Sequence, residues 1–269
     1  MIVVNQVPVE RVGRGERPVV DGETYWRASS LAQVLDDTTN LSKWMQRQVL
    51  IGVAKSPDLV AQAATTDPGD SRTLNELVRE SLSRAKSRKG ANFGTAIHSA
   101  TELMDRGADI SDLPESVQFD AAAYRDALAA AQMEPLMGEV FVACPELKVA
   151  GSFDRLLRHM VSGGTAIGDL KTSEPKPYDI SAYNGLKWSI QLAVYAHSTP
   201  YCAERGWLSW ESLGVPAPSQ DRGVVIHVNQ GVAESSVYLV DIAAGWQYAK
   251  LAAGVLDARR SGPKLATPL

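Results

Sequence analysis

Residues 167–173 read IGDLKTS, a short apolar strand that carries an acid and a base two positions apart. Side chains at positions i and i+2 of a strand project to the same face of the sheet. Asp169 and Lys171 are therefore expected side by side, with Leu170 pointing into the opposite layer. The pair is either a salt bridge at the end of a strand or part of a functional site.

Strand patterns on both sides of this stretch define the fold. Residues 137–144 (MGEVFVAC) and 148–157 (KVAGSFDRLL) precede it, with turns at 145–147 and 162–164, so the three segments predict a meander. Two hairpins are predicted, over 18–26 with a turn at Asp21-Gly22 and over 223–241. Helices are predicted from Leu31 behind a Ser29 or Ser30 cap, over 41–89 with breaks near 56 and 67, and over 92–107, 114–132, 184–198 and 242–260. This order predicts an α/β fold in which helices pack on a central mixed sheet.

Composition bounds the function classes. The net charge of −4 argues against a protein that coats nucleic acid without specificity, although it allows an enzyme with a local basic path. Cys144 and Cys202 supply neither a four-cysteine metal site nor a disulfide framework, which favours a reducing cytoplasm. The N-terminus lacks a signal-peptide pattern, and no apolar run reaches the roughly 18 residues of a membrane span. A cytoplasmic protein is expected.

The predicted hairpin brings a second carboxylate to Asp169. With a turn at 162–164, Asp154 falls opposite residues 171–173, and Asp169 falls opposite residues 156–158. Cross-strand neighbours of this kind lie about 5 to 8 Å apart. Two carboxylates at that distance repel, and one has its pKa raised unless a cation lies between them. Carboxylate oxygens favour Mg²⁺ or Mn²⁺ as that cation.

Simple ion pairs are the alternative to a metal site. Asp154 has Arg155 and Arg158 as nearby partners in the sequence, and Asp169 has Lys171. Each ion pair alone is the commoner arrangement, because charged pairs at strand ends are frequent. The two acids together, with a third candidate ligand available, favour the site.

That third candidate is His98 in the helix predicted over 92–107. It stands off the apolar stripe, on the face that carries Gly94, Thr101 and Asp105, and Gly94 leaves room for a bulky group to approach. A lone helical histidine is either a surface or core-edge residue or a ligand.

Four motifs occur in a fixed order: GTAIH (94–98), GSFD (151–154), DLK (169–171) and QLAVY (191–195). Together they resemble the successive motifs of RecB-like nucleases of the PD-(D/E)XK superfamily, over roughly residues 90–200. That group includes helicase-linked nuclease domains, phage exonucleases and CRISPR-associated exonucleases. The resemblance implies a restriction-endonuclease-like core, a central mixed β-sheet flanked by helices, with a helical N-terminal part.

The resemblance also implies roles for residues. His98, Asp154, Asp169 and the Leu170 carbonyl become metal ligands for Mg²⁺ or Mn²⁺. Asp154, Asp169 and Lys171 become the catalytic set. Lys171 orients the attacking water or stabilises developing charge. We favour this over a role as base, because a base would need a lowered pKa and the negative charge of Asp169 opposes that change at Lys171. An iron–sulfur cluster, which some relatives bind through four cysteines, is not expected here.

Further residues are expected to contact DNA. Gln191 and Tyr195 match the QxxxY helix motif of the family, with a solvated Gln and a packed Tyr as the alternative, and Thr172 follows the catalytic lysine. Glu139 is either an auxiliary acid or a solvated strand residue. Trp44 and Trp188 could stack on DNA bases, but we expect both to be core residues. A basic cluster either contacts phosphates or forms a solvated helix end: Arg84, Lys86, Arg88 and Lys89.

The expected function is a metal-dependent DNA exonuclease that acts in recombination, repair or replication and is encoded by a phage. The resemblance implies a single-strand annealing recombinase as partner and allows a homo-oligomer. A structure-specific or nicking endonuclease with the same site is the alternative enzyme, and a nuclease-dead DNA-binding subunit is the alternative of another class. We expect residues 1–90 to form a hairpin and helical region packed on the core, 91–260 the nuclease core, and 261–269 a flexible tail.

Overall fold

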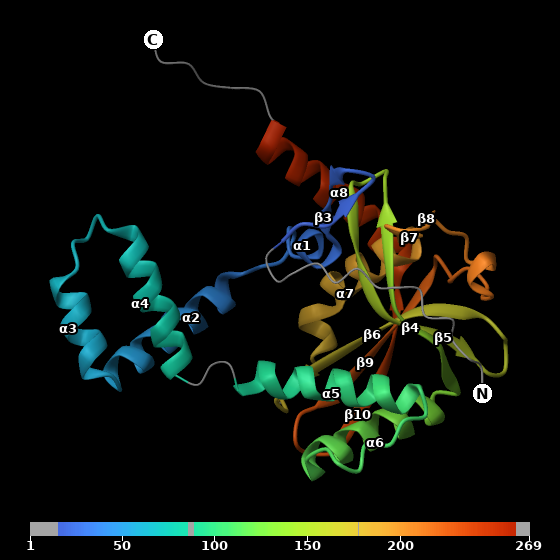
Figure 1. The fold of residues 1–269 in the computed structure, drawn as a ribbon, viewed down its shortest axis with the longest axis horizontal. Coiled ribbons are helices and arrows are strands. Elements are labelled where there is room, and N and C mark those ends of the chain that lie inside the picture. Colours follow the sequence, from blue (N-terminus) through green and yellow to red (C-terminus); the bar gives the residue numbers. More distant parts are fainter. Residues whose placement is uncertain (1–15, 86–88, 177, 262–269) are drawn as a thin grey trace. The chain divides into compact units, whose positions relative to one another are not determined.

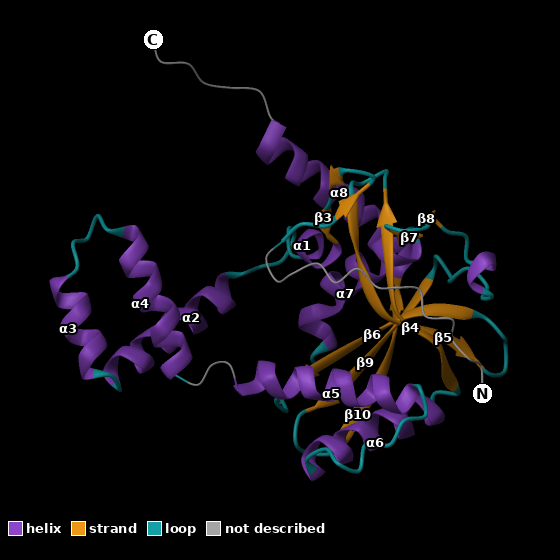
Figure 2. Ribbon diagram, viewed as in Figure 1, coloured by secondary structure: helices purple, strands orange, loops and turns teal. Residues whose placement is uncertain are grey.

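The computed structural model describes residues 16–85, 89–176 and 178–261. It is an α/β protein with a mixed central sheet flanked by helices, as predicted (Figures 1 and 2). The chain divides into two compact units, one of residues 37–96 and one of residues 1–36 with 97–269. The expected boundary at residue 90 thus differs from the observed division, and the N-terminal hairpin belongs with the sheet. The expected tail lies outside the described residues apart from Ser261.

The sheet of the larger unit has the strand order β10-β9-β6-β5-β4-β7-β8, and β3 pairs with β5. Its centre is the predicted antiparallel meander of β4, β5 and β6. β9 lies parallel to β6 and antiparallel to β10, which makes the sheet mixed. The strands are β3 (Trp26–Arg27), β4 (Met133–Cys144), β5 (Val149–His159), β6 (Thr165–Ser173), β7 (Thr199–Cys202), β8 (Gly206–Trp207), β9 (Arg222–Asn229) and β10 (Glu234–Asp241).

Helices cover both faces of this sheet (Figure 2). On one face, α1 (Ala28–Ala32), α7 (Ser181–Ala196) and α8 (Ile242–Ser261) contribute to one apolar core with β4, β5 and β9. On the other face lie α6 (Glu115–Ala130) and the part of α5 (Lys89–Asp105) that follows residue 96. A short 3₁₀ helix, Glu211–Leu213, interrupts the loop before β9. Among the described residues, none of the helices is long and apolar enough to cross a lipid bilayer.

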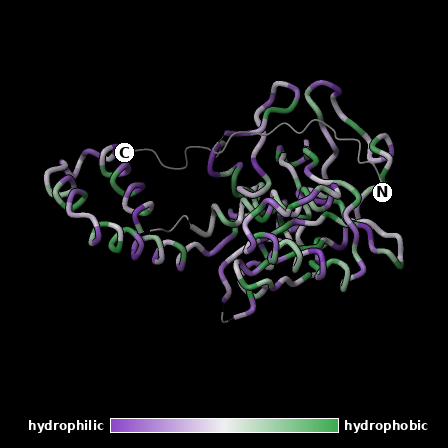
Figure 3. Tube along the Cα trace, turned by 60° about the horizontal axis from the view of Figure 1, so that its bottom comes forward, coloured by the Kyte–Doolittle hydropathy of each residue, from purple (hydrophilic) through white to green (hydrophobic). Residues whose placement is uncertain are grey.

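The smaller unit is helical, with breaks where Pro57 and the 67–69 turn predict them. Its helices are α2 (Thr39–Ala54), α3 (Pro57–Thr65) and α4 (Ser71–Arg84), followed by the start of α5. Figure 3 shows hydrophobic and hydrophilic residues alternating along them, as amphipathic helices require. At Gly52, α2 comes so close to α4 that an added Cβ would lie 2.0 Å from the Ser81 carbonyl oxygen.

Two local predictions are confirmed. The hairpin of β1 (Val19–Val20) and β2 (Glu23–Thr24) turns at Asp21 and Gly22, whose φ angles are both positive, as a two-residue turn of the I′ kind requires. Trp188 is buried, as expected of a core residue.

Two others are wrong. The first helix begins at Ala28 behind Arg27, not at Leu31 behind Ser29 or Ser30, because β3 runs directly into α1 and leaves no separate cap. Trp44 is 40% exposed on α2 rather than buried, since the face of α2 that meets α4 is built around Gly52 and Val49 instead.

Candidate active site

The β5–β6 hairpin sets two aspartates against each other. Its ladder pairs Arg158 with Thr165 at one end and Arg155 with Gly168 at the other. Asp154 and Asp169 are the next residues on the two strands, so they lie at the same level of the hairpin. The predicted register, with Asp154 opposite residues 171–173, is wrong. The loop closes earlier than the predicted turn: the His159 N–H donates to the Gly164 carbonyl at 2.9 Å, and the Gly163 N–H donates to the His159 carbonyl at 2.8 Å.

Beyond the last β5–β6 pair, the main chain of β6 forms a hydrogen bond with a side chain of β5. The backbone N–H of Leu170 donates to Asp154 Oδ2 at 2.7 Å. At Gly168 the packing is so tight that an added Cβ would lie 2.7 Å from Leu157 Cδ1. Glycine at this position therefore lets β6 approach Leu157 closely, and the two strands part directly after it.

Asp154 does not form the simple ion pair that the sequence offers as an alternative. Arg155 pairs with Asp105, with Nε and Oδ2 2.6 Å apart, and Arg158 pairs with Glu134. His98 approaches Asp154 instead, with its Nδ1 3.8 Å from Asp154 Oδ2.

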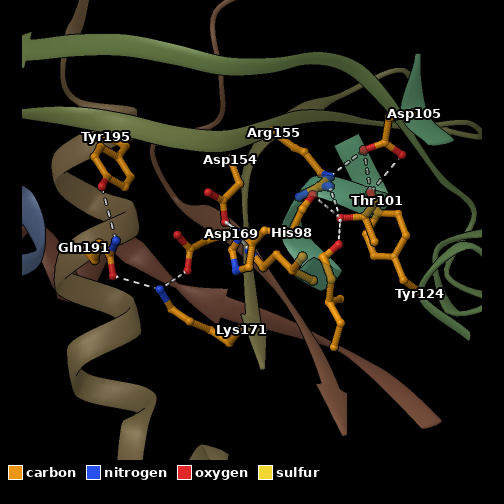
Figure 4. Close-up of polar contacts among 12 residues, drawn as sticks. His98, Thr101, Asp105, Tyr124, Asp154, Arg155, Asp169, Lys171, Gln191 and Tyr195 are labelled. Atoms are coloured by element: carbon orange, nitrogen blue, oxygen red, sulfur yellow. Dashed lines mark hydrogen bonds and ion pairs between the residues drawn. The ribbon is translucent and has the colours of Figure 1, made fainter. Parts of the chain in front are cut away.

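Asp169 and Lys171 lie side by side, as predicted, and form an ion pair. Figure 4 shows the Lys171 ammonium between Asp169 and Gln191 of α7. Lys171 Nζ lies 3.3 Å from Gln191 Oε1, and Gln191 Nε2 lies 3.2 Å from the Tyr195 hydroxyl. Gln191 is buried, so the alternative of a solvated glutamine is wrong, while Tyr195 is packed in the core.

The charges of this site are strongly perturbed. Burial raises the pKa of the Asp169 carboxyl, the Lys171 ammonium opposes that rise, and the Asp154 carboxylate adds to it. Burial by itself lowers the pKa of Lys171, but the attraction of Asp169 and Asp154 outweighs burial and raises that pKa. The side chain of Lys171 is therefore held in its charged form.

The predicted metal ligands are neighbours without a closed coordination shell. As they stand, no three His, Cys, Asp or Glu side chains within the described ranges are close enough to hold a metal ion together. The donor chemistry nevertheless suits a hard divalent cation, because His98, Asp154, Asp169 and the Leu170 carbonyl offer oxygen and imidazole donors. An ion bound there would compete with Lys171 for the Asp169 carboxylate.

A cleft of about 340 Å³ borders Gln191 and Tyr195 of α7, and none of the residues His98, Asp154, Asp169 and Lys171 lines it. Gln191, Tyr195 and Glu139 line it, together with Arg27 and Ser29 from the β3–α1 junction. Glu139 lies on β4 between residues paired with Arg155 and Phe153, next to Asp154, and its φ of 36° is rare for a non-glycine residue. Arg27 and Ser29 are not predicted at this site from the sequence, because it is the pairing of β3 with β5 that brings them to this place.

Of the other predicted DNA contacts, the structure describes the side chains of Thr172 and Arg84. Thr172 follows Lys171, and its hydroxyl accepts a hydrogen bond from Gln230 Nε2 at 3.1 Å. Arg84 lies in the smaller unit and pairs with Asp58 and Glu80. Lys86 and Arg88 lie outside the described residues, and the structure does not describe the side chain of Lys89.

Comparisons with known proteins place this chain in no family. No protein-family model and no curated protein matches it. One solved structure that resembles it is described as "Crystal structure of SSO0001". The match has a TM-score of 0.28 and 10% sequence identity, and it covers 60% of this chain and 71% of the other.

Proposed function

We propose that this protein is a metal-dependent DNA exonuclease of the RecB-like group, with a restriction-endonuclease-like core. The observation that carries the proposal is the constellation at the end of the β5–β6 ladder. Two carboxylates from adjacent strands lie beside a charged lysine, and a histidine from α5 approaches the first carboxylate. The motif resemblance described above involves the same residues.

Hydrolysis of a phosphodiester needs an in-line water, relief of charge on the phosphate, and stabilisation of the leaving oxygen. Asp154, Asp169, His98 and the Leu170 carbonyl are the residues that would hold Mg²⁺ or Mn²⁺. Such an ion supplies an activated water and neutralises a non-bridging oxygen of the phosphate. Asp154 is oriented for this task by the Leu170 N–H, which fixes one of its oxygens.

Lys171 acts through its charge. Its raised pKa keeps the ammonium protonated, so it serves poorly as a base and well as a fixed positive charge facing the phosphate. Gln191 holds the same ammonium from α7, and Tyr195 in turn contacts Gln191. We assign Gln191 and Tyr195 to the positioning of Lys171 and to the wall of the DNA path, with Glu139 as an auxiliary acid on the same cleft.

The biological setting follows from the resemblance alone. We propose a role in DNA recombination or repair, beside a single-strand annealing recombinase, for an enzyme encoded by a phage. The overall charge of −4 requires that DNA be guided by local features rather than by the surface as a whole.

The test uses end-labelled linear DNA and closed circular DNA, each with Mg²⁺, Mn²⁺ or EDTA. Metal-dependent loss of the linear substrate alone is expected, with no loss in Asp169→Asn or Lys171→Ala. Asp221→Asn is the matched control, because Asp221 is an exposed aspartate at the start of β9 and away from the carboxylates. This control is expected to cleave like the unmodified chain.

Other outcomes separate the alternatives. Metal-dependent cutting of circles identifies an endonuclease with the same site and overturns the exonuclease assignment. Binding of DNA with no cleavage in any metal overturns both enzyme assignments and leaves a DNA-binding subunit. Products from 5′- and 3′-labelled duplex and single strands then define polarity and strand preference.

A further inference from the structure

We propose that Arg155 and Thr101 are positioning residues that fix His98 relative to Asp154. The inference rests on the proposed function, since it concerns two of the proposed ligands. It assigns a role to a buried polar network that the proposed chemistry does not use. Figure 4 shows this network beside the carboxylate site, with Arg155 reaching towards Thr101, Asp105 and Tyr124.

Arg155 joins the strand of one ligand to the helix of another. It directly follows Asp154 on β5, and its side chain extends to α5, where Thr101 and Asp105 lie one and two turns beyond His98. Arg155 Nη2 lies 2.7 Å from Thr101 Oγ1, and Arg155 Nε lies 2.6 Å from Asp105 Oδ2. The planar guanidinium can serve both partners at once only in one relative placement of the two elements.

Thr101 carries this contact to the backbone of His98. A guanidinium only donates hydrogen bonds, so the Thr101 oxygen must accept from Arg155 and its own proton must point elsewhere. That proton faces the carbonyl oxygens of Ile97 and His98, each 3.0 Å from Thr101 Oγ1. The hydrogen bonds therefore run from Arg155 through Thr101 to the main chain of His98.

The network is enclosed on its remaining sides. Arg155 is 1% exposed, and its guanidinium lies 4.7 Å from the centre of the Tyr124 ring. The Tyr124 hydroxyl donates to both oxygens of Asp105 at 3.1 and 3.0 Å. Apolar side chains would fill such a place at lower desolvation cost, so a charged, fully bonded network is better explained by the placement that it enforces.

The experiment compares Thr101→Val with Thr101→Ser in the full chain. Valine keeps the volume but removes the hydroxyl, whereas serine keeps the hydroxyl. Four quantities are measured: Mn²⁺ affinity by electron paramagnetic resonance without DNA, the His98 ring signal in metal-free ¹H–¹³C spectra, and kcat and KM for linear DNA. Thr101→Val is expected to weaken Mn²⁺ binding about 10-fold or more, the usual effect of removing such a support. It is also expected to shift the His98 signal and to lower kcat with little change in KM.

Thr101→Ser is expected to restore the Mn²⁺ affinity, the His98 signal and kcat, and Thr165→Val is the matched control. Thr165 is a buried threonine on β6 whose hydroxyl donates to the Ala217 carbonyl at 2.9 Å, away from the site. Its replacement removes a comparable hydrogen bond without touching His98. Mn²⁺ affinity and the His98 signal are therefore expected to stay at their original values in Thr165→Val.

Unchanged Mn²⁺ affinity together with an unchanged His98 signal in Thr101→Val overturns the proposal, as does an equal loss in Thr165→Val. If Thr101→Val does not fold, Arg155→Lys takes its place, because lysine keeps the charge but lacks the fork that reaches both partners. If the unmodified chain neither binds Mn²⁺ nor cleaves DNA, the proposed function fails. The His98 signal of the metal-free variants still decides whether Arg155 and Thr101 position that residue.

Discussion

The backbone N–H of Leu170 donates a 2.7 Å hydrogen bond to Asp154 Oδ2, at the point where β5 and β6 stop pairing with each other. The N–H of Leu170 on β6 thus bonds to the side chain of Asp154, the residue of β5 next to the last ladder pair, and not to the main chain of β5. Leu170 is buried, so this N–H has little access to water as a replacement. Asp154 consequently has a structural task as well as the proposed chemical one, and substitutions can separate the two.

Asp154→Asn is expected to abolish metal-dependent cleavage while leaving the fold intact. The amide oxygen still accepts from Leu170, but the negative charge is lost. Loss of several kcal/mol of metal-assisted stabilisation corresponds to at least about 100-fold in rate. Asp154→Ala is expected to lose cleavage equally and to destabilise the fold by about 1–3 kcal/mol, because the N–H of Leu170 is left without its partner. Urea unfolding in EDTA measures the difference, and equal stability of the two variants contradicts the structural task.

Lys171→Met is expected to separate catalysis from metal binding. The variant loses the ammonium that stabilises charge on the phosphate, and kcat is expected to fall about 10²–10³-fold, the range for removing one such group. Mn²⁺ should bind at least as tightly as before, because the cation no longer competes with Lys171 for Asp169. Calorimetric titration checks the affinity. A large fall in affinity would mean that Lys171 supports the ligands instead.

Gly52→Ala is expected to destabilise the smaller unit by about 1–3 kcal/mol, the usual cost of overpacking. The new methyl group meets the backbone of Ser81 on α4, which cannot swing aside like a flexible side chain. Gly254→Ala is the matched control on α8, where an added Cβ meets nothing within 4 Å. That change is expected to stabilise the helix by about 0.8–1 kcal/mol. Hydrogen exchange of residues 37–85, compared with that of the sheet, shows which unit each change affects.

Arg84→Gln is expected to leave DNA binding almost unchanged. Arg84 Nη1 lies 2.5 Å from Asp58 Oδ1, and Nε lies 2.9 Å from Glu80 Oε1, so its charge is already directed at two carboxylates. Loss of one phosphate contact reduces the slope of log affinity against log salt by about 0.7–0.9. We expect a smaller change than that. A full reduction of the slope would restore Arg84 as a DNA contact.

Acidification is expected to destabilise the sheet through His227. Burial lowers the pKa of this imidazole. Its Nε2 lies 3.0 Å from Ser173 Oγ, and the residue that pairs with His227 on β6 is the positively charged Lys171. The folded state favours the neutral imidazole, so the contribution of His227 to the free energy of unfolding is complete above the ordinary pKa of about 6.5. It is lost as the pH falls from there towards the lower pKa of the folded state.

Urea unfolding at pH 7.5 and 5.5 measures this effect. His227→Gln is expected to reduce the fall in unfolding free energy between the two values, because glutamine does not titrate. An unchanged fall in the variant would assign the pH dependence to other groups.

The elements that the sequence predicts well are those with strong local signals. The Asp21-Gly22 turn, the breaks at Pro57 and near residue 67, and the alternation of the meander are each encoded within a few residues. Register is different, because a hairpin can close its loop at several neighbouring positions. Only the close packing of Gly168 on Leu157 and the pairing through His159 and Gly164 decide among them.

The candidate site shows the same division. The nearness of Asp169 to Lys171 follows from strand geometry, and the structure agrees. The partner of Arg155 cannot be predicted from strand geometry, because Asp105 is 50 positions away in the sequence. The two residues meet only when α5 packs against β5. Arg27 reaches the cleft only because β3 pairs with β5, and two-residue strands have no pattern of their own.

The pairing of β3 with β5 also has a consequence for synthesis on the ribosome. Trp26 is paired with Val149, 123 positions later, and residues 37–96 between them form a compact unit of their own. At translation rates of about 5–20 residues per second, the N-terminal strand waits roughly 6 to 25 s for its partner to be made. The inserted helices are complete long before that, so the two units are expected to fold in the reverse of the order in which their first residues emerge.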